Sequence, residues 1–344
     1  MELVKYRPYP KLITKKTEVT RPRYPVVDAH NHLSNPFGGG WDKKPLSQLL
    51  DLLDEAAIQQ YIDLDGGWGE EILINHIHHF KEKAPDRFQV FGGVDWNAWH
   101  ERGEGFTDWA AGRIRVQKNA GAQGIKIWKP FGLKVTDHTG QLVKIEDERL
   151  APIWQTAGEL KLPVLIHVAD PVAFFDPIDE TNERWEELGN HPDWAFTSPP
   201  FPPFIEILNG LKTLVQRHPS TTFIGAHVGC YAENLAWVGN MLEECPNYYI
   251  DISGRIGELG RQPYTAREFF IRYQDRILFG SDMGPDVETY RINYRFLETF
   301  DEYFNYSTSE IPDQGRWYIY GLGLPDEVLR KVYQGNARRV LEMG

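Results

Sequence analysis

Near the start of the chain, residues 26–32 read VVDAHNH, an apolar run that ends in two histidines one residue apart. β-Branched residues favour a strand, and side chains two residues apart in a strand point to the same face. We therefore expect His30 and His32 to face the same side as Asp28 and to converge on one point. Two imidazoles at a rigid strand end suit Zn²⁺ and similar ions, although an HxH pair alone is a weak signal.

This run is the first of eight short apolar runs, which alternate with stretches of helical character. The alternation indicates βα units around a parallel sheet. The expected strands are Val26–His30, Ile58–Leu64, Phe88–Val94, Gly124–Trp128, Pro163–Val168, Thr222–His227, Tyr248–Ile252 and Ile277–Gly280. Eight such units close a barrel, so the predicted fold is an α/β (β/α)₈ TIM barrel in a single domain. Helices are expected at Leu46–Ala57, Phe204–Gln216, Asp286–Glu302, Pro325–Val332 and Asn336–Leu341.

Two segments lie outside this alternation within the predicted barrel of residues 25–344. Residues 1–24 form an N-terminal arm with seven Lys and Arg against two Glu, interpreted as a solvated tail or a strap on the barrel or a neighbouring subunit. Residues 174–203 follow the fifth strand and are rich in Pro, acidic and aromatic residues. Such a loop overhangs the carboxyl ends of barrel strands, which predicts a lid; a surface excursion or subunit contact is the alternative.

The composition is that of an ordinary soluble globular protein, with 41% hydrophobic and 25% charged residues in 344. A formal net charge of −12 argues against a nucleic-acid partner and favours a small-molecule substrate. No apolar run has the length of a membrane span and no signal-peptide pattern is present, so we expect no membrane association and a cytoplasmic location. The arm and the aromatic segment Trp317–Tyr320 would suit a homo-oligomer contact.

Three later strands also end in a residue that can bind a metal: His167, His227 and Asp282. Catalytic side chains of a barrel gather at the carboxyl ends of its strands. Each residue has a structural alternative, because either histidine could be a hydrogen-bonded core residue and Asp282 could cap a helix. Together with the HxH pair, however, the set favours a metal centre.

This pattern of an HxH, two later histidines and a final aspartate resembles the amidohydrolase superfamily. The resemblance covers roughly residues 26–341 and is carried by VDAHNH at 27–32, LFGSD at 278–282 and GNARRVL at 335–341. It looks most like the amidohydrolase-related branch that includes metal-dependent lactonases and nonoxidative decarboxylases. The resemblance implies one divalent metal per chain, usually Zn²⁺ with Mn²⁺ as an alternative, held by His30, His32, His167 and Asp282, with His227 beside it.

Three nitrogen ligands and a carboxylate would leave a position for water, whose pKa a metal lowers from 15.7 to about 7. Asp282 would hold or accept the proton of this water, and His227 would orient the substrate or stabilise negative charge. The leading interpretation is a hydrolase in which the activated water attacks the carbonyl of a small polar or anionic lactone, ester or amide. A nonoxidative decarboxylase of an aromatic or enol acid is the alternative. A silent barrel that serves as a binding module ranks third, because the ligand set is complete.

Lys126 and Trp128 on the fourth strand are expected to bind substrate. Some binuclear members of the superfamily carry a carbamylated lysine on this strand, which would add a second ion. The resemblance favours one ion, so Lys126 would instead meet a substrate carboxylate or hydroxyl, with a structural ion pair as the alternative. Trp128, with Trp96 and Phe131, would stack on a ring or pack under the lid.

Arg255 has the planar fork that clamps a carboxylate, and Arg261 is a weaker candidate of the same kind. For both, a loop salt bridge with Glu258 or Asp251 is equally open.

The histidines of residues 74–80, INHIHHF, are scattered around a helix expected behind the barrel wall. We interpret His76, His78 and His79 as a solvated helix face.

Overall fold

The computed structural model describes residues 5–6, 8–34 and 38–343. Its strands within these residues are short, parallel and almost entirely buried, as strands covered by helices on one side and filled by a core on the other must be. They pair in chain order, β1 to β3 in one sheet and β4 to β9 in another. The strands are β1 Val26–Asn31, β2 Ile58–Asp63, β3 Phe88–Val90, β4 Gly92–Gly93, β5 Ile125–Ile127, β6 Val164–Ile166, β7 Phe223–Gly225, β8 Tyr248–Asp251 and β9 Ile277–Leu278.

Backbone hydrogen bonds join these two sheets into one closed barrel. Only Phe91 separates β3 from β4, and its N–H donates to the carbonyl of Asp63 at 2.9 Å. At the other junction, the N–H of Ala29 donates to the carbonyl of Phe279 at 2.9 Å, and the N–H of Asp282 donates to the carbonyl of His30 at 3.0 Å. The predicted TIM barrel is therefore confirmed, with the third expected strand divided into β3 and β4.

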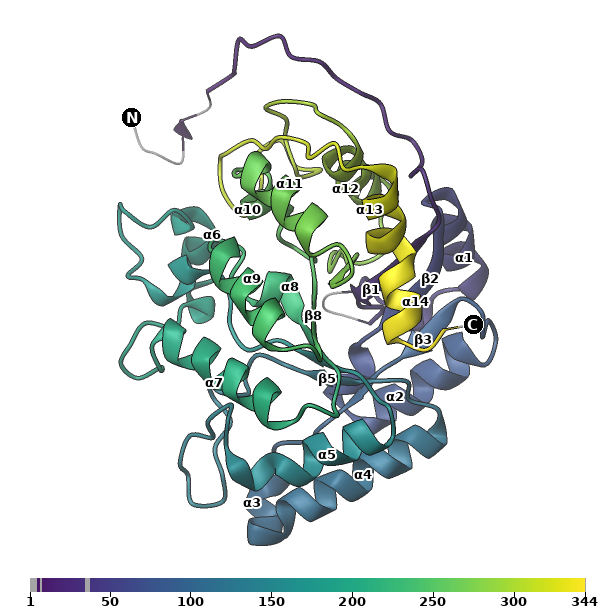
Figure 1. Ribbon diagram of the computed structural model, residues 1–344, viewed down its shortest axis with the longest axis vertical. Helices are drawn as coiled ribbons and strands as arrows, with labels where there is room; N and C mark the ends of the chain where they lie inside the picture. Colours follow the sequence, from purple (N-terminus) through teal and green to yellow (C-terminus); the bar gives the residue numbers. More distant parts are fainter. Residues whose placement is uncertain (1–4, 7, 35–37, 344) are drawn as a thin grey trace.

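Helices surround the strands, as Figure 1 shows. Each long helix packs an apolar stripe against the outside of the barrel, and the buried residues of α7 follow the helical period. The helices are α1 Leu46–Glu55, α2 Glu70–His76, α3 Ala98–Arg102, α4 Phe106–Ala120, α5 Ala151–Glu159, α6 Trp185–Asn190, α7 Phe204–Arg217, α8 Ala226–Gly229, α9 Leu235–Glu244, α10 Ile256–Leu259, α11 Pro263–Arg272, α12 Val287–Glu298, α13 Asp326–Arg330 and α14 Asn336–Val340.

One expected helix is shorter than predicted. Asp286 caps α12 by accepting the N–H of Thr289, and the helix ends at Glu298 instead of Glu302. The hydroxyl of Thr299 donates back to the carbonyl of Arg295 at 2.8 Å, an interaction that competes with continued helix. The chain then forms a long connection, residues 299–325, before α13.

The core has two main parts. The larger packs the strands against the helices, whereas the smaller contains alternate strand residues and marks the barrel interior. Ala337 of α14 and Leu341 belong to this inner cluster, so the C-terminal helix is part of the barrel core. The inner cluster comprises Val27, Ala29, Ile62, Leu64, Phe91, Leu165, Ile224, Ala226, Leu278, Ala337 and Leu341.

The described part of the N-terminal arm runs in an extended path outside α10 to α13 (Figure 1). Thr17 holds it there, because its N–H and hydroxyl both donate to the carboxylate of Asp301 at 2.6 Å. Near the barrel, the guanidinium of Arg23 lies 2.9 Å from the carboxylate of Asp326. This arm is therefore a strap on its own chain; a contact with a second subunit remains a prediction.

Residues 174–203 lie between β6 and α7 and contain α6 between two 3₁₀ turns. Ion pairs connect this segment to parts of the chain that follow β8: Arg184 to Glu258, and Arg261 to Glu183 at 2.7 Å. Its role as a lid remains a prediction. None of the helices in the described residues has the length and apolar character needed to cross a membrane.

Candidate metal centre

The predicted metal-binding residues follow the carboxyl ends of their strands. His30 is on β1, His32 lies just beyond it, and His167, His227 and Asp282 follow β6, β7 and β9. The side chains of the four histidines are at most 11% exposed, whereas the side chain of Asp282 is 27% exposed.

Asp28 does not share the environment of the histidines, contrary to the expected alternation. Its carboxylate accepts hydrogen bonds from Asn31, Ser281 and Tyr290, all at 2.7–2.8 Å. The pairing of β1 with β2 is irregular between Asp28 and Asn31, and this irregularity breaks the two-residue period. Asp28 therefore joins β1 to the turn after β9 and to α12.

Three of the four predicted ligands come together. The ligand atoms of His30, His32 and Asp282 all lie within 4.8 Å of one another. Asp282 Oδ1 is 3.1 Å from His32 Nε2 and 3.7 Å from His30 Nε2. Ligand bonds of 2.0–2.1 Å in a tetrahedron place ligand atoms about 3.3 Å apart, so this donor set fits one Zn²⁺-sized ion.

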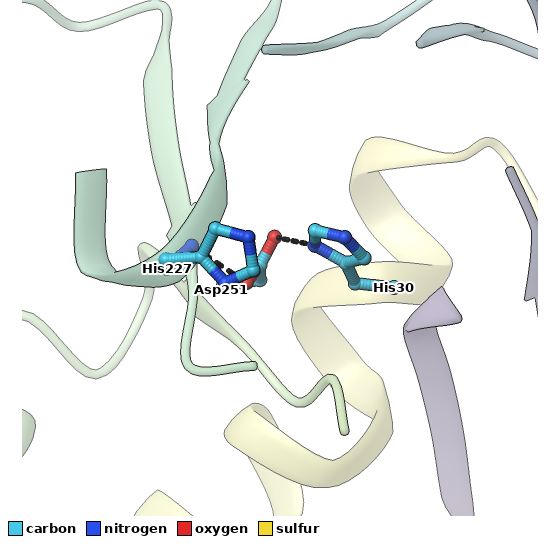
Figure 2. Close-up of side chains that lie close together, drawn as sticks. All are labelled: His30, His227 and Asp251. Atoms are coloured by element: carbon cyan, nitrogen blue, oxygen red, sulfur yellow. Dashed lines mark hydrogen bonds and ion pairs between the residues drawn. The ribbon is translucent and has the colours of Figure 1, made fainter. Parts of the chain in front are cut away.

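Buried carboxylates fix the orientation of both histidines. His30 Nδ1 lies 2.9 Å from Asp251 Oδ2, and His32 Nδ1 lies 2.7 Å from Asp65 Oδ1. Each carboxylate accepts a hydrogen bond from Nδ1–H, so Nε2 is the atom of each ring that would bind a metal, in place of a proton on His32 and of the contact between His30 and Lys126. Figure 2 shows Asp251 between the rings of His30 and His227.

The electrostatics of the site favour a cation. Burial alone would lower the pKa of His32, but the carboxylates of Asp282 and Asp65 raise it to about 9. Burial would raise the pKa of Asp282, yet His30, His32 and His227 hold it well below its usual range. The carboxylates are therefore ionised near neutral pH and attract positive charge.

His227 lies beside this set in a fixed tautomer. Its Nδ1 donates to the carbonyl of Ser253 at 2.8 Å, which leaves the Nε2 lone pair 3.7 Å from Asp282 Oδ2. Burial lowers the pKa of His227 well below its ordinary value, with help from His167 and Arg255. A neutral ring with this tautomer accepts a proton or binds a metal; it does not donate to a developing anion at Nε2.

His167 is near the set but is turned away from it. Its ring centroid lies 4.4 Å from that of His227, while its Nε2 faces the carbonyl of Ala169 at 3.1 Å. Burial lowers the pKa of His167 to about 4, so the ring is neutral. To act as the fourth ligand through Nε2, His167 must exchange its bond to Ala169 for the metal.

Two site residues have backbone angles that side chains seldom adopt. Asp282 has φ of 54°, and His227 has φ of 58°, followed by Val228 at 59°. A β-branched residue in this region is strained, and such strain clusters at functional sites. The N–H of His227 donates to Asp251 Oδ1 at 3.0 Å, which shows how the buried carboxylate supports the turn.

Lys126 and Trp128 line the same region. The ammonium of Lys126 lies 3.2 Å from His30 Nε2 and 4.9 Å from the Trp128 ring centroid. Burial lowers the pKa of Lys126 to about 8, although Asp282 and Asp251 oppose this effect. Trp128 stacks on Trp68 at 3.8 Å and on His32 at 5.1 Å, so its ring supports a ligand histidine. Trp96 and Phe131 stack on each other at 4.7 Å.

The two candidate arginines differ in their partners. Arg255 is buried, and its guanidinium donates to the carbonyl of Gly254 at 2.8 Å. Among the described residues, no carboxylate forms an ion pair with Arg255, so the alternative salt bridge with Glu258 or Asp251 is absent there. Arg261 instead holds both oxygens of Glu183.

The interpretation of His76 as a solvated residue is wrong. His76 is buried, its Nδ1 lies 2.5 Å from Asp63 Oδ2, and its Nε2 lies 3.1 Å from Ser34 Oγ. Ser34 in turn donates to Asp65, the carboxylate that holds His32. His78 is exposed, as expected.

Asp251 and Asp65 belong to the candidate site, and the sequence reasoning did not select them. Asp251 ends β8, and Asp65 follows β2, so both stand at the carboxyl end of a strand like the residues that were chosen. An acid at or just after the end of a strand is a signal that the sequence contains at these two positions. Their role in orienting histidines depends on pairings across the barrel, which no local pattern encodes.

The sequence matches the family model described as amidohydrolase over residues 27–343. Among proteins of curated function, no significant match to the sequence is found.

Solved structures share the fold at low sequence identity. A 2,6-dihydroxybenzoate decarboxylase from Rhizobium superposes with a TM-score of 0.57 at 17% identity, covering 93% of this chain and 99% of that one. A dihydroxybenzoic acid decarboxylase from Polaromonas sp. JS666, with bound manganese, gives 0.53 at 17% identity over 87% and 86%. A probable 2-pyrone-4,6-dicarboxylic acid hydrolase from Acinetobacter baumannii gives 0.52 at 11% identity over 93% and 100%. These similarities show the fold, and the family match over nearly the whole sequence shows that the chain belongs to the amidohydrolase family of enzymes.

Proposed function

We propose that the protein is a metal-dependent hydrolase that cleaves a lactone, ester or amide of a small polar or anionic molecule. The observation that carries this proposal is the convergence of His30 Nε2, His32 Nε2 and Asp282 Oδ1, at spacings of 3.1 and 3.7 Å to the carboxylate. The two carboxylates that hold Nδ1 of each histidine support it further.

In this proposal one divalent ion, Zn²⁺ or alternatively Mn²⁺, is held by His30, His32 and Asp282. His167 becomes the fourth ligand when its Nε2 leaves the carbonyl of Ala169. When bound, the ion supplies a Lewis acid that polarises a carbonyl and lowers the pKa of water. The dihydroxybenzoic acid decarboxylase from Polaromonas sp. JS666 contains bound manganese, which supports a divalent ion in a barrel of this fold.

Side chains of the protein then transfer the proton of the attacking water and attract the charge of the substrate. The carboxylate of Asp282 accepts the proton of the attacking water while the new carbon–oxygen bond forms. The same proton passes to the leaving oxygen or nitrogen as its bond to the carbonyl carbon breaks. His227, with its Nε2 lone pair 3.7 Å from Asp282, serves as an additional proton acceptor. The cations of Lys126 and Arg255 attract an anionic substrate.

A decarboxylase of an aromatic or enol acid is the second candidate. The buried ammonium of Lys126, 3.2 Å from His30 Nε2, favours it, because this cation can hold a substrate carboxylate beside the ligands. Two of the structures with this fold carry the name of dihydroxybenzoate decarboxylases. In that reaction the carboxylate leaves as CO₂ and a proton takes its place on carbon.

One experiment separates these possibilities. Protein purified without chelator is assayed for metal by elemental analysis, then tested on a panel of lactones, esters and amides and on 2,6-dihydroxybenzoate. About one Zn²⁺ or Mn²⁺ per chain and formation of the carboxylate product from a member of the carbonyl panel are expected. CO₂ release without hydrolysis would transfer the assignment to the decarboxylase, and no metal after reconstitution would transfer it to a binding module. The variant His32→Ala should lose both metal and activity, whereas the exposed control His78→Ala should keep them.

A further inference from the structure

We propose that a cavity beside Asp282 binds an uncharged, hydroxyl-bearing part of the substrate, about the size of one six-membered ring. That the occupant of this cavity is part of the substrate rests on the proposed function. The cavity itself stands on the geometry of five parts of the chain: α6, the turn after β8 with the start of α10, the turn between β9 and α12, α12 itself, and the connection 299–325.

The cavity shares its wall with the candidate metal centre. Ser281 and Met283 line it and flank Asp282 in the chain. Gly254 also lines it, and a Cβ atom at this position would lie 3.8 Å from His227 Nδ1. A substrate that reaches Asp282 and His227 with its carbonyl group therefore has this cavity as an adjoining space.

The volume sets the size of the occupant. The cavity measures about 190 Å³. An engineered cavity of about 150 Å³ takes up benzene, so this space suits one substituted six-membered ring or a chain of similar bulk. A hollow of about 580 Å³ beside α2 is larger, but its lining includes Ser34 and His76 and none of the proposed ligands.

The lining sets the chemistry of the occupant. Among the described residues, the lining combines the apolar side chains of Ile256, Met283 and Ile292 with hydroxyl and amide side chains such as those of Thr289, Asn293 and Ser307, and it includes no Lys, Arg or His. Its two acids do not create a strong anionic site, because Glu187 is paired with Arg184 at 2.8 Å and Asp313 is exposed. An anionic group would find no cationic side chain in this described lining, and the nearby guanidinium of Arg184 is already paired with Glu187. A ring with a hydroxyl group would find apolar contacts together with donors and acceptors.

The cavity wall is fixed by bonds within the protein. The amide of Gln314 donates to the carbonyl of Gly254 at 3.0 Å, which joins the connection 299–325 to the turn after β8. The hydroxyl of Tyr306 donates to the carbonyl of Gly315 at 3.0 Å. The space is therefore formed before a ligand arrives, as small-molecule sites usually are.

These observations divide the substrate into two parts. The acyl group and any negative charge lie with Asp282 and the cations Lys126 and Arg255, and the uncharged hydroxylated part lies in the cavity. The substrate class is accordingly an ester, lactone or amide of a hydroxylated acid, not a molecule with anionic groups at both ends.

The test uses binding of small probes to the metal-loaded full chain and needs no turnover. Benzyl alcohol represents the uncharged hydroxylated ring and benzenesulfonate represents an anionic ring of equal size, both followed by ligand-observed NMR. The variant Ile292→Trp fills the cavity, and Ile205→Trp, on the exposed side of α7, is the matched control. We expect Ile292→Trp to weaken benzyl alcohol binding at least about tenfold and Ile205→Trp to leave it unchanged.

Equal binding of benzyl alcohol to wild type and Ile292→Trp would overturn the proposal, as would tight benzenesulfonate binding that Ile292→Trp abolishes. Should Ile292→Trp fail to fold, Thr308→Trp narrows the cavity from its exposed rim. Failure of the proposed function is seen separately. Cavity-dependent probe binding without any hydrolysis would keep this inference and reject the hydrolase. Hydrolysis of hydroxylated substrates with a KM that Ile292→Trp does not change would reject the cavity and keep the hydrolase.

Discussion

Two clusters of histidines and carboxylates lie side by side in this barrel, and they share Asp65. In the first, His30 and His32 have their Nδ1 atoms held by Asp251 and Asp65. In the second, His76 has its Nδ1 held by Asp63 at 2.5 Å. Both arrangements contain three residues whose ligand atoms lie within 4.8 Å of one another, so residue type and spacing alone would make both of them metal sites.

The difference lies in where the remaining lone pairs point. In the second cluster, His76 Nε2 bonds to Ser34, Asp63 Oδ1 accepts the N–H of Asp65, and Asp65 accepts four further bonds. In the first cluster, both Nε2 atoms converge on Asp282, whose side chain is open to solvent. In the second cluster the ligand atoms bond to the surrounding framework, whereas in the first they face one another and the ammonium of Lys126, 3.2 Å from His30 Nε2, beside a carboxylate that solvent reaches. The first cluster is therefore the better candidate for a metal centre.

The largest expected effect comes from removing a ligand. His32→Ala should lower metal affinity by more than the ten- to hundredfold effect of losing an outer partner. His76→Ala is the matched control and should change metal affinity by less than about threefold. Metal titration with a fluorescent competitor measures both, and equal losses in the two variants would contradict the distinction between the clusters.

A smaller effect is expected when an orienting carboxylate becomes an amide. Asp251 Oδ1 accepts the N–H groups of His227 and Ser253, so the amide introduced by Asp251→Asn would keep its oxygen there and present its nitrogen to His30 Nδ1. His30 would then carry its proton on Nε2 and lose the lone pair for the metal. Asp251→Asn should lower metal affinity by about ten- to hundredfold in the same titration.

The control for this variant is Asp63→Asn, which makes the same substitution in the second cluster. It should leave metal affinity unchanged, because Asp63 contacts no proposed ligand in the described residues. Asp63→Asn should instead lower the free energy of unfolding by about 1–3 kcal/mol, because it disturbs a buried hydrogen bond, and denaturant titration measures this loss. A loss of metal in Asp63→Asn would show that the clusters act as one site.

Asp65, which belongs to both clusters, should affect both metal affinity and stability when it is changed, each to a smaller extent. Asp65→Asn retains one oxygen that can still accept the N–H groups of Leu33 and Ser34. We expect roughly a tenfold loss of metal affinity together with a lower free energy of unfolding. Normal affinity with reduced stability alone would assign Asp65 to the second cluster only.

The fold and most of the candidate centre could be predicted from the sequence, because those features depend on short local patterns. Several apolar runs end in, or are closely followed by, a residue that can bind a metal, and this rule places His30, His32, His227 and Asp282 at or just after strand ends. The expected strands match the observed ones because parallel barrel strands are buried on both faces, which gives continuous apolar runs.

The features that the sequence did not reveal depend on contacts between distant segments. The irregularity in β1 separates Asp28 from the histidines, and it depends on pairing with β2. The burial of His76 depends on Asp63, which is 13 residues away on a strand, whereas the helical period alone predicts a solvated face. The orientation of His167 toward Ala169 is set by side-chain packing, which no spacing of residues encodes.

The smallest effect expected concerns the pH dependence of the second cluster. Burial alone would lower the pKa of His76, but the carboxylate of Asp63 raises it above the ordinary histidine value. A raised folded-state pKa gives stability that is fully present below the unfolded pKa of about 6.5 and is lost as pH rises through the folded pKa. Glutamine does not titrate, so the difference in unfolding free energy between wild type and His76→Gln should be larger at about pH 6 than at about pH 9. Denaturation with chelator present measures this without a contribution from bound metal. A difference that stays constant or grows with pH would show that His76 is neutral in the folded protein, and the second cluster would then be a network of uncharged hydrogen bonds.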